Sequence, residues 1–216
     1  MYFYEKRGSY QVKCYRYDLT DEMRDKALDF AKKIILSDNQ YSRLLPEDVF
    51  LSNDIELKNK IEIQRTYMGK LGEIAFLKLL KDKNKVVDTS GMFTIYEGQR
   101  KTDSYDFITD FSESVDVKTG FRYNHSRLLV NLEQFNSKPK NFYVAVRLNA
   151  TDTNIDTKLV DWFSVTHADI LGFVEFDFLN EKCDIKNFGE GDAKFIPYNR
   201  LLGIDRLSLQ NYLHLD

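Results

Sequence analysis

Cysteine is scarce in this chain of 216 residues, which contains only Cys14 and Cys183. These two cysteines are far apart in sequence, and the three histidines give no Cys/His spacing that suits zinc. The sequence therefore predicts neither a disulfide framework nor a zinc site. We expect the protein to fold in a reducing, cytoplasmic environment.

Long apolar runs are also missing. No segment approaches the roughly 18 uninterrupted apolar residues that a membrane-spanning helix needs. The opening stretch, MYFYEKRGSY, lacks the apolar core of a signal peptide. Because internal repeats and low-complexity linkers are absent too, the sequence predicts one compact unit that does not associate with a membrane.

Excess positive charge is the third absence. The chain has 31 Lys and Arg residues against 34 Asp and Glu residues, which gives a net charge of −3. Domains that bind nucleic acid are usually basic, so the overall charge argues against such a partner. A local basic groove is nevertheless enough to hold phosphate groups.

The most informative stretch covers residues 105–122 and reads YDFITDFSESVDVKTGFR. Strand-forming residues predict one short strand over residues 105–109 and a second over 115–119. The polar run at residues 110–114 predicts a turn between them. This stretch is therefore expected to form a β-hairpin.

Three charged side chains converge in this hairpin. Asp106 on the first strand faces Asp116 on the second, and Lys118 shares the face of Asp116 because residues two apart on a strand point the same way. Neighbouring carboxylates repel each other unless a cation lies between them. Mg²⁺ prefers carboxylate, water and phosphate oxygens, so the pattern predicts a divalent-metal site where Lys118 orients a water or offsets phosphate charge.

The triplet of an acid, any residue and a lysine is not diagnostic by itself, because it recurs in this chain. The triplet that begins at Asp116 differs in its apolar strand setting, in a second acid ten positions upstream, and in a glutamate-bearing helix before both. The five occurrences are Glu56/Lys58, Asp116/Lys118, Asp156/Lys158, Asp184/Lys186 and Asp192/Lys194.

The upstream helix is predicted over residues 68–80, where apolar residues recur at helical spacing. Gly69 and Gly72 each cost a helix roughly 1 kcal/mol relative to alanine, which favours close packing of this helix on the sheet. Glu73 would then point towards Asp106. Glu73 is equally consistent with an ordinary solvated residue, in which case the glycines mark a break in the helix.

The succession of Glu73 on a glycine-containing helix, Asp106 on a strand and Asp116-Val117-Lys118 on the next strand resembles the PD-(D/E)XK nuclease superfamily. The resemblance covers about residues 66–135 and consists of short, degenerate motifs. Tyr105 stands where the motif has proline, a residue that is often missing in the superfamily.

This resemblance implies a Mg²⁺-dependent endonuclease that hydrolyses DNA phosphodiester bonds, with Mn²⁺ as a substitute ion. Asp106, Asp116 and the Val117 carbonyl would be the metal ligands. Lys118 would lie beside the attacking water, and Glu73 would match the helix glutamate found in many members.

The same resemblance implies an α/β fold that is restriction endonuclease-like, with a central mixed β-sheet flanked by helices. We expect a single nuclease domain over residues 1–216, in which 1–60 form an N-terminal strand and helical extension and 61–216 form the catalytic core. Double-stranded DNA is the expected partner. A homodimer, formed through residues 20–60 or the C-terminal leucines, would supply one active site for each DNA strand.

Type II restriction endonuclease is the leading role, because the chain is short and lacks helicase motifs. Two alternatives stay open. One is a repair, junction-resolving or mobile-element nuclease of the same fold. The other is a non-catalytic binding or assembly protein whose acid cluster is merely solvated.

Arg122, His125 and Arg127 follow the hairpin and are candidates for binding a nucleic-acid backbone. They are equally compatible with an exposed hairpin that binds nothing. Gln134 lies further on, and some superfamily branches carry a glutamine after the lysine. One glutamine is too little to choose a branch.

Other segments predict the framework around this hairpin. Residues 20–37 predict a helix, and the nearly continuous apolar run at 142–148 predicts a strand buried on both faces. Residues 166–171 predict a short helix or turn, and the alternating run FVEFDF at 173–178 predicts a strand. The leucine-rich stretch 197–213 is expected to be a packing or dimer surface.

Overall fold

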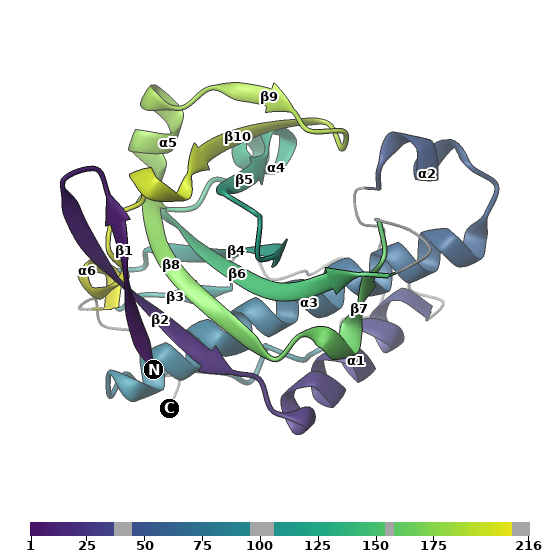
Figure 1. Cartoon of the computed structure of the whole chain (residues 1–216), viewed down its shortest axis with the longest axis horizontal. Coiled ribbons are helices and arrows are strands. Elements are labelled where there is room, and N and C mark those ends of the chain that lie inside the picture. The colour runs from purple at the N-terminus through teal and green to yellow at the C-terminus, as the bar shows by residue number, and fades with distance from the viewer. Residues whose placement is uncertain (37–44, 96–105, 154–157, 209–216) are drawn as a thin grey trace.

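The central layer of the protein is a seven-stranded β-sheet. The structure is a computed structural model that describes residues 1–36, 45–95, 106–153 and 158–208 (Figure 1). The strands follow the order β1-β2-β8-β6-β4-β3, and β7 pairs with β6. Only the β4–β6 pair is parallel among these described strands, so the sheet is mixed. The strands are β1 (Tyr2–Arg7), β2 (Tyr10–Asp18), β3 (Phe107–Ile108), β4 (Ser114–Arg122), β6 (Phe142–Asp152), β7 (Val160–Asp161) and β8 (His167–Glu175).

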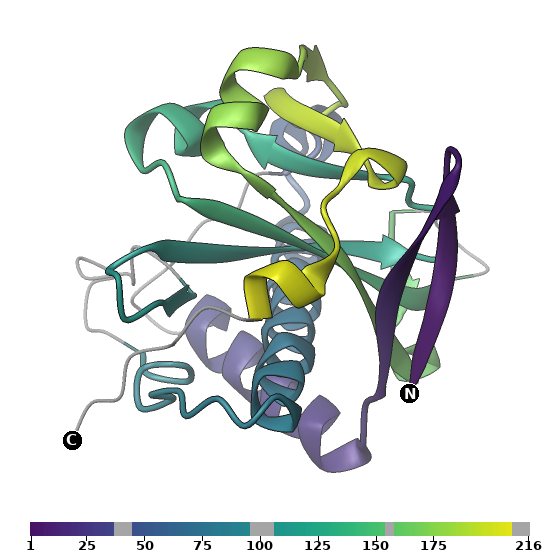
Figure 2. The same ribbon diagram turned by 90° about the vertical axis from the view of Figure 1, so that its left-hand side faces the viewer.

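One face of this sheet is covered by helices α1 (Asp21–Leu36) and α3 (Ile55–Asp82) (Figure 2). The short α2 (Glu47–Leu51) lies near the second layer, where the Glu47 N–H donates to the Gly189 carbonyl at 3.4 Å. Helix α3 begins after Asp54, whose side chain accepts a 2.9 Å hydrogen bond from the Leu57 N–H. Apolar side chains of both long helices and of the sheet form the larger hydrophobic core. No helix in the described ranges combines the length and the apolar character needed to cross a membrane.

The opposite face carries a second layer. This layer consists of a three-stranded sheet, in the order β5-β10-β9, with two short helices (Figure 2). It encloses a smaller core with the central strands, which includes Cys14, Tyr143 and Leu171. The remaining elements are β5 (Arg127–Asn131), α4 (Leu132–Ser137), η2 (Trp162–Ser164), α5 (Phe176–Lys182), β9 (Ile185–Asn187), β10 (Asp192–Pro197), η3 (Tyr198–Arg200) and α6 (Ile204–Ser208).

The expected α/β class and the central mixed sheet flanked by helices are confirmed, as are the helix at residues 21–36 and the buried central strand, which is β6. The separate helical stretch 54–65 and the glutamate helix are one continuous helix, α3. Residues 2–36 contribute two strands and a helix to the central sheet and its helical layer.

Two C-terminal predictions were wrong. Residues 166–171 were expected to form a helix or turn, but β8 begins at His167. The alternating run at 173–178 was expected to be a strand, but the chain turns into helix α5 at Phe176. The reason is that β8 ends at Glu175, opposite the start of β6 at Phe142, so no neighbouring strand pairs with the chain beyond it.

The C-terminal leucines in the described part of the chain pack inside the molecule. Leu201, Ile204 and Leu207 are buried, and the last two lie in the larger core. They are therefore a packing surface and not an exposed dimer surface. Leu209 and Leu213 of the same expected surface lie outside the described residues.

Strand β4 separates its side chains between the two cores by the usual alternation of a strand. Val115 and Val117 belong to the core with α3, and Thr119 faces the same helix. Asp116 and Lys118 therefore face the second layer. This strand is the element on which the candidate site is built.

Gly72 brings α3 into close contact with β4. A Cβ atom at Gly72 would lie 2.0 Å from Oγ1 of Thr119, so the expected close approach of helix and sheet is confirmed at this position. Gly69 was expected to share this role, but a Cβ there would meet no atom within 4 Å. The interface therefore requires only one of the two glycines.

We expect Gly72→Ala to destabilise the protein by about 1–3 kcal/mol, because Thr119, packed against the helix, cannot move far enough to admit a methyl group. Thr119→Ala should restore most of this loss in the double variant, since it removes the clashing oxygen. Chemical denaturation of the two single variants and the double variant measures the coupling.

Gly69→Ala is the matched control, because it adds the same methyl group three residues earlier, in open space. It should stabilise the helix by roughly 1 kcal/mol. Equal effects of the two substitutions would contradict the packing role of Gly72.

Candidate active site

Asp106 lies at the end of the β3–β4 pairing, and its carboxylate takes part in the hydrogen bonding of β4. Its N–H donates to the Val115 carbonyl at 3.1 Å, and its Oδ2 accepts from the Val117 N–H at 2.7 Å. Continuing the β3–β4 register by one residue places Asp106 opposite Asp116, as the sequence predicts. Tyr105, the residue in the proline position of the motif, lies outside the described residues.

The turn between these strands forms in the expected polar run. The Ser112 N–H donates to the Thr109 carbonyl at 2.9 Å, and Ser112 adopts a positive φ of 61°. The Thr109 N–H donates to the Glu113 carbonyl, also at 2.9 Å. This tight connection fixes the register that brings the two aspartates together.

The environment of Asp106 disfavours its negative charge. Burial of its carboxyl group raises its pKa well above the ordinary value, and the charges of Glu73 and Asp116 raise that pKa further. The Val117 hydrogen bond and the charge of Lys118 act in the opposite direction. Asp106 keeps part of its surface in solvent. A cation that approaches from solvent would favour ionisation of the carboxyl group.

Lys118 is held between two acceptors. Its Nζ lies 2.7 Å from Oδ2 of Asp116 and donates a 2.9 Å hydrogen bond to Oε1 of Gln134. Gln134 stands in the first turn of α4, where the N-cap residue Asn131 accepts a 3.1 Å hydrogen bond from its N–H. The second layer therefore reaches over β4 and orients the ammonium group.

Asp116 is 7% exposed, and its Oδ2 is buried without a hydrogen-bond partner among the described residues. The contact with Lys118 is an ion pair that lacks hydrogen-bond geometry. The Lys118 ammonium offsets the charge of this buried carboxylate, and a metal ion could supply the coordination that hydrogen bonds do not. This oxygen and Asp106 form a donor set that suits Mg²⁺.

No group of three or more His, Cys, Asp or Glu side chains in the described ranges is arranged to hold a metal ion. Mg²⁺ commonly takes only one or two protein carboxylates and completes its shell with waters and phosphate oxygens. Two aspartates and a backbone carbonyl therefore fit this ion better than an ion that needs a complete protein cage.

The Val117 carbonyl lies on the side of β4 that faces Asp106 and β3. The Val117 N–H points towards Asp106, and the N–H and C=O of one strand residue point to the same side. Within the described residues, the pairing of β3 with β4 runs only as far as Val115. The carbonyl expected as a further ligand is therefore directed towards the two aspartates.

Glu73 approaches the site from the other side of β4, because it belongs to α3. Its Oε2 forms a 2.5 Å ion pair with Nζ of Lys70, and both side chains are largely buried. The Glu73 charge is felt at Asp106, where it raises the pKa. Glu73 therefore acts on Asp106, whereas Lys118 and Gln134 lie on the opposite face of the strand.

The three expected phosphate-binding cations lie at the far end of β4. Arg122 is six residues beyond Asp116, which corresponds to about 20 Å at about 3.3 Å per residue. Arg122 forms an ion pair with Asp152, and Arg127 lies over the Phe188 ring with its guanidinium carbon 5.3 Å from the ring centre. These cations are therefore remote from the acids and partly engaged within the protein.

Sequence reasoning missed Lys140, which is 5% exposed. Its N–H donates to the Tyr143 hydroxyl at 3.1 Å, and Tyr143 lies beside Asp116 in the parallel β4–β6 register. Burial lowers the pKa of Lys140, while the charge of Asp116 raises it. No local sequence pattern could have revealed this neighbour. Its position depends on the pairing of β4 with β6, in which Asp116 lies beside Tyr143, 27 residues further along the chain.

A surface hollow of about 410 Å³ adjoins Lys140 at the starts of β4 and β6. Its lining includes the carboxylates of Glu113, Glu175 and Asp177 and does not include Asp106 or Asp116. Three carboxylates repel a phosphate group. The chemistry of the aspartates is therefore more informative about function than this hollow.

Comparisons of the chain with protein-family models, with curated proteins and with solved structures found no match. The function has to be argued from the geometry of the site.

The raised pKa of Asp106 predicts the pH dependence of stability. When an acid has a higher pKa in the folded state than in the unfolded state, folding is opposed as the pH rises through the folded-state pKa. We expect Asp106→Asn to raise the melting temperature at pH 7–8 without metal, because the amide oxygen still accepts from Val117. The advantage should vanish near pH 3, below the ordinary pKa of about 3.9.

Glu181→Gln is the control, since Glu181 is an exposed acid whose ion pair with its neighbour Lys182 is 3.8 Å long. Thermal unfolding between pH 3 and pH 8 should show no comparable trend for this variant. A gain for Asp106→Asn that is independent of pH would show that the charge is not its cause.

Proposed function

We propose that the protein is a metal-dependent endonuclease that hydrolyses phosphodiester bonds of double-stranded DNA. The observation that carries this proposal is the arrangement of Asp106, the buried Asp116 carboxylate and the Lys118 ammonium, whose Nζ is ion-paired with Oδ2 of Asp116 at 2.7 Å. These groups combine a site for a hard divalent cation with a fixed positive charge on one strand. That combination suits attack of water on a phosphate.

Each residue has a distinct task in this proposal. The Val117 N–H orients the carboxylate of Asp106. Lys118, held by Asp116 and Gln134, stabilises the negative charge that develops on the phosphate in the transition state. Because Lys118 is oriented before the substrate binds, this stabilisation requires little reorganisation.

Asp106, Asp116 and the Val117 carbonyl would hold Mg²⁺, and Mn²⁺ prefers the same oxygen ligands. When bound, the ion would neutralise phosphate charge and make a water more acidic. Burial, with the charges of Glu73 and Asp116, keeps the pKa of Asp106 high in the absence of the ion. Metal binding would therefore release a proton from this site.

The distance along β4 is consistent with a duplex substrate. About 20 Å separates Asp116 from Arg122, and DNA rises about 3.4 Å for each base pair. A duplex whose scissile phosphate lies at the aspartates would reach Arg122 and Arg127 about six base pairs away. Arg127 is exposed and therefore accessible to such a backbone.

The proposed biological role is that of a type II restriction endonuclease acting as a homodimer, since cutting both strands requires a second active site. An exposed apolar cluster on α2 and the start of α3 offers a surface for the second copy. Phe50, Leu51 and Ile55 are 65%, 71% and 71% exposed. They lie within the region expected to mediate association.

Lys118→Ala should reduce the rate of DNA cleavage by about 10²–10³-fold while DNA binding is retained, because it removes one preorganised electrostatic group. Asp106→Ala and Asp116→Ala should abolish cleavage and also lose calorimetric Mg²⁺ binding. Plasmid cleavage with and without Mg²⁺ measures the first effect, and titration of the metal measures the second.

Lys186→Ala is the matched control, because Lys186 belongs to the triplet Asp184-Ile185-Lys186 and its strand β9 lies in the second layer. This variant should cleave like the parent protein. Loss of activity in Lys186→Ala but not in Lys118→Ala would show that the active site does not lie on β4. A parent protein that neither binds Mg²⁺ nor cuts DNA would favour a non-catalytic binding role.

A charge placed in the exposed apolar cluster tests the proposed dimer. Leu51→Glu should convert a dimeric parent into a monomer, because apolar contact area would be replaced by a charge at the interface. Light scattering reads the mass, and unchanged circular dichroism excludes unfolding. A parent that is monomeric with and without DNA would support a nicking enzyme.

A further inference from the structure

Gly120 lies on the same face of β4 as Asp116 and Lys118, and it is crowded by two polar side chains. A Cβ atom at Gly120 would lie 2.7 Å from the Tyr198 hydroxyl and 2.9 Å from Nδ1 of His125. Arg147 is its neighbour in the parallel β4–β6 register. We call Gly120, His125, Arg147 and Tyr198 the Gly120 cluster.

Polar groups of this cluster lack partners within the described part of the chain. Tyr198 is only 5% exposed, yet its hydroxyl has no hydrogen-bond partner there, and neither does the His125 ring. The Nε of Arg147 is buried and also unpaired. Buried donors are normally satisfied, so the buried Nε of Arg147, next to two further polar groups that make no hydrogen bond within the described residues, indicates a place for an acceptor from outside the chain.

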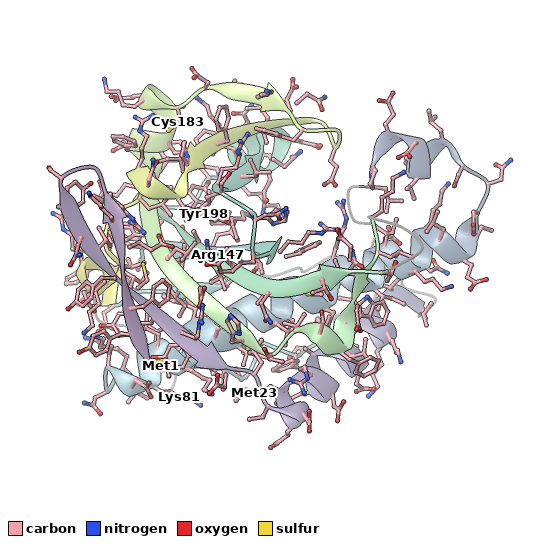
Figure 3. The ribbon with its side chains drawn as sticks, viewed as in Figure 1. Met1, Met23, Lys81, Arg147, Cys183 and Tyr198 are labelled. Atoms are coloured by element: carbon pink, nitrogen blue, oxygen red, sulfur yellow. The ribbon has the colours of Figure 1, made fainter. Side chains whose placement is uncertain are left out.

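Arg147 is held rigidly in this position. Its NH2 lies 3.2 Å from Asp169 and 3.5 Å from Glu5, and its guanidinium carbon lies 4.7 Å from the centre of the Tyr123 ring. Figure 3 shows Arg147 and Tyr198 on the same side of the central sheet. The buried Nε therefore belongs to a side chain that cannot easily turn away.

The ion pairs around Arg147 leave a positive charge. They form a chain that runs Arg7, Glu5, Arg147, Asp169, Arg16, in which three arginines face two carboxylates. Asp169 and Arg7 are each 1% exposed. The net charge of this largely buried chain is +1, so the external acceptor that suits the cluster is an anion.

We propose that the Gly120 cluster binds a phosphate of the nucleic-acid strand, adjacent to the phosphate at Asp106 and Asp116. The inference rests on the proposed function. Gly120 lies two residues from Lys118, about 6.6 Å along the strand, which matches the separation of neighbouring phosphates on one chain. The Tyr198 hydroxyl, the neutral His125 ring and Arg147 would donate to its oxygens.

Glycine is needed here because a Cβ atom would clash with the Tyr198 hydroxyl and the His125 ring and would displace these two groups. Burial and the charge of Arg122 lower the pKa of His125, which keeps its ring neutral near pH 7 with one N–H donor. The charges of nearby Asp152 and Glu190 raise the pKa of His125, but they offset only part of this lowering. The site therefore combines neutral donors with one fixed guanidinium.

Tyr198→Phe tests the proposal, since it removes only the hydroxyl. We expect about tenfold weaker binding of a 20-base-pair duplex, measured by fluorescence anisotropy in EDTA, because one hydrogen bond to a charged group is lost. The melting temperature should not fall, because the hydroxyl has no partner in the described protein. Tyr67→Phe, which removes a buried hydroxyl on the α3 side of the sheet, should bind like the parent.

A duplex series with one neutral methylphosphonate at successive positions identifies the phosphate. One position should weaken binding to the parent about tenfold and have no further effect on Tyr198→Phe. Gly120→Ala should reproduce the loss if it folds. Equal binding by the parent and Tyr198→Phe at every position would overturn the proposal and assign only an ordered water to the cluster.

Binding in EDTA is measured without turnover, so the two proposals can fail separately. A parent that does not cut DNA, combined with a Tyr198→Phe defect in binding, would retain the phosphate site and remove the nuclease. A parent that cuts DNA, combined with normal binding by Tyr198→Phe, would retain the nuclease and remove the phosphate site.

Discussion

Mutual repulsion of carboxylates around β4 is the constraint on which the site depends. Glu73, Asp106 and Asp116 approach one strand from three directions, and the protein supplies a cation to two of them: Lys70 to Glu73 and Lys118 to Asp116. Asp106 receives a backbone N–H, which only partly offsets its raised pKa. Among these three carboxylates, Asp106 is therefore the one without a cation of its own, and this shortage of positive charge favours a cation beside it.

The two layers around the sheet have different tasks in maintaining this arrangement. Gly72 lets α3 approach β4 closely enough to bury Val115 and Val117, so the strand cannot shift without opening the larger core. The second layer supplies Gln134 to Lys118 and Tyr198 to Gly120. One layer thus fixes the strand, and the other provides polar partners along its opposite face.

Much of this site could be predicted from sequence because its determinants are local. Alternation along residues 114–119 decides which side chains share a face, and the polar turn at 110–113 decides the register that pairs Asp106 with Asp116. Lys140 depends instead on parallel pairing of β4 with β6, which no local pattern encodes. The prediction of a strand over residues 173–178 failed for the same reason. Alternation continues in the sequence beyond Glu175, where β8 ends because its partner strand β6 begins opposite it.

The acidic composition is weaker evidence against a nucleic-acid partner than it first suggests, because charge is distributed unevenly over the sheet. Carboxylates gather at the start of β4 and at the nearby hollow, where a phosphate would need a metal ion to approach. Further along the same face, the chain of ion pairs through Arg147 has a net positive charge. A polyanion lying along β4 would therefore meet an acidic region first and a cationic region next, although the whole protein carries a charge of −3.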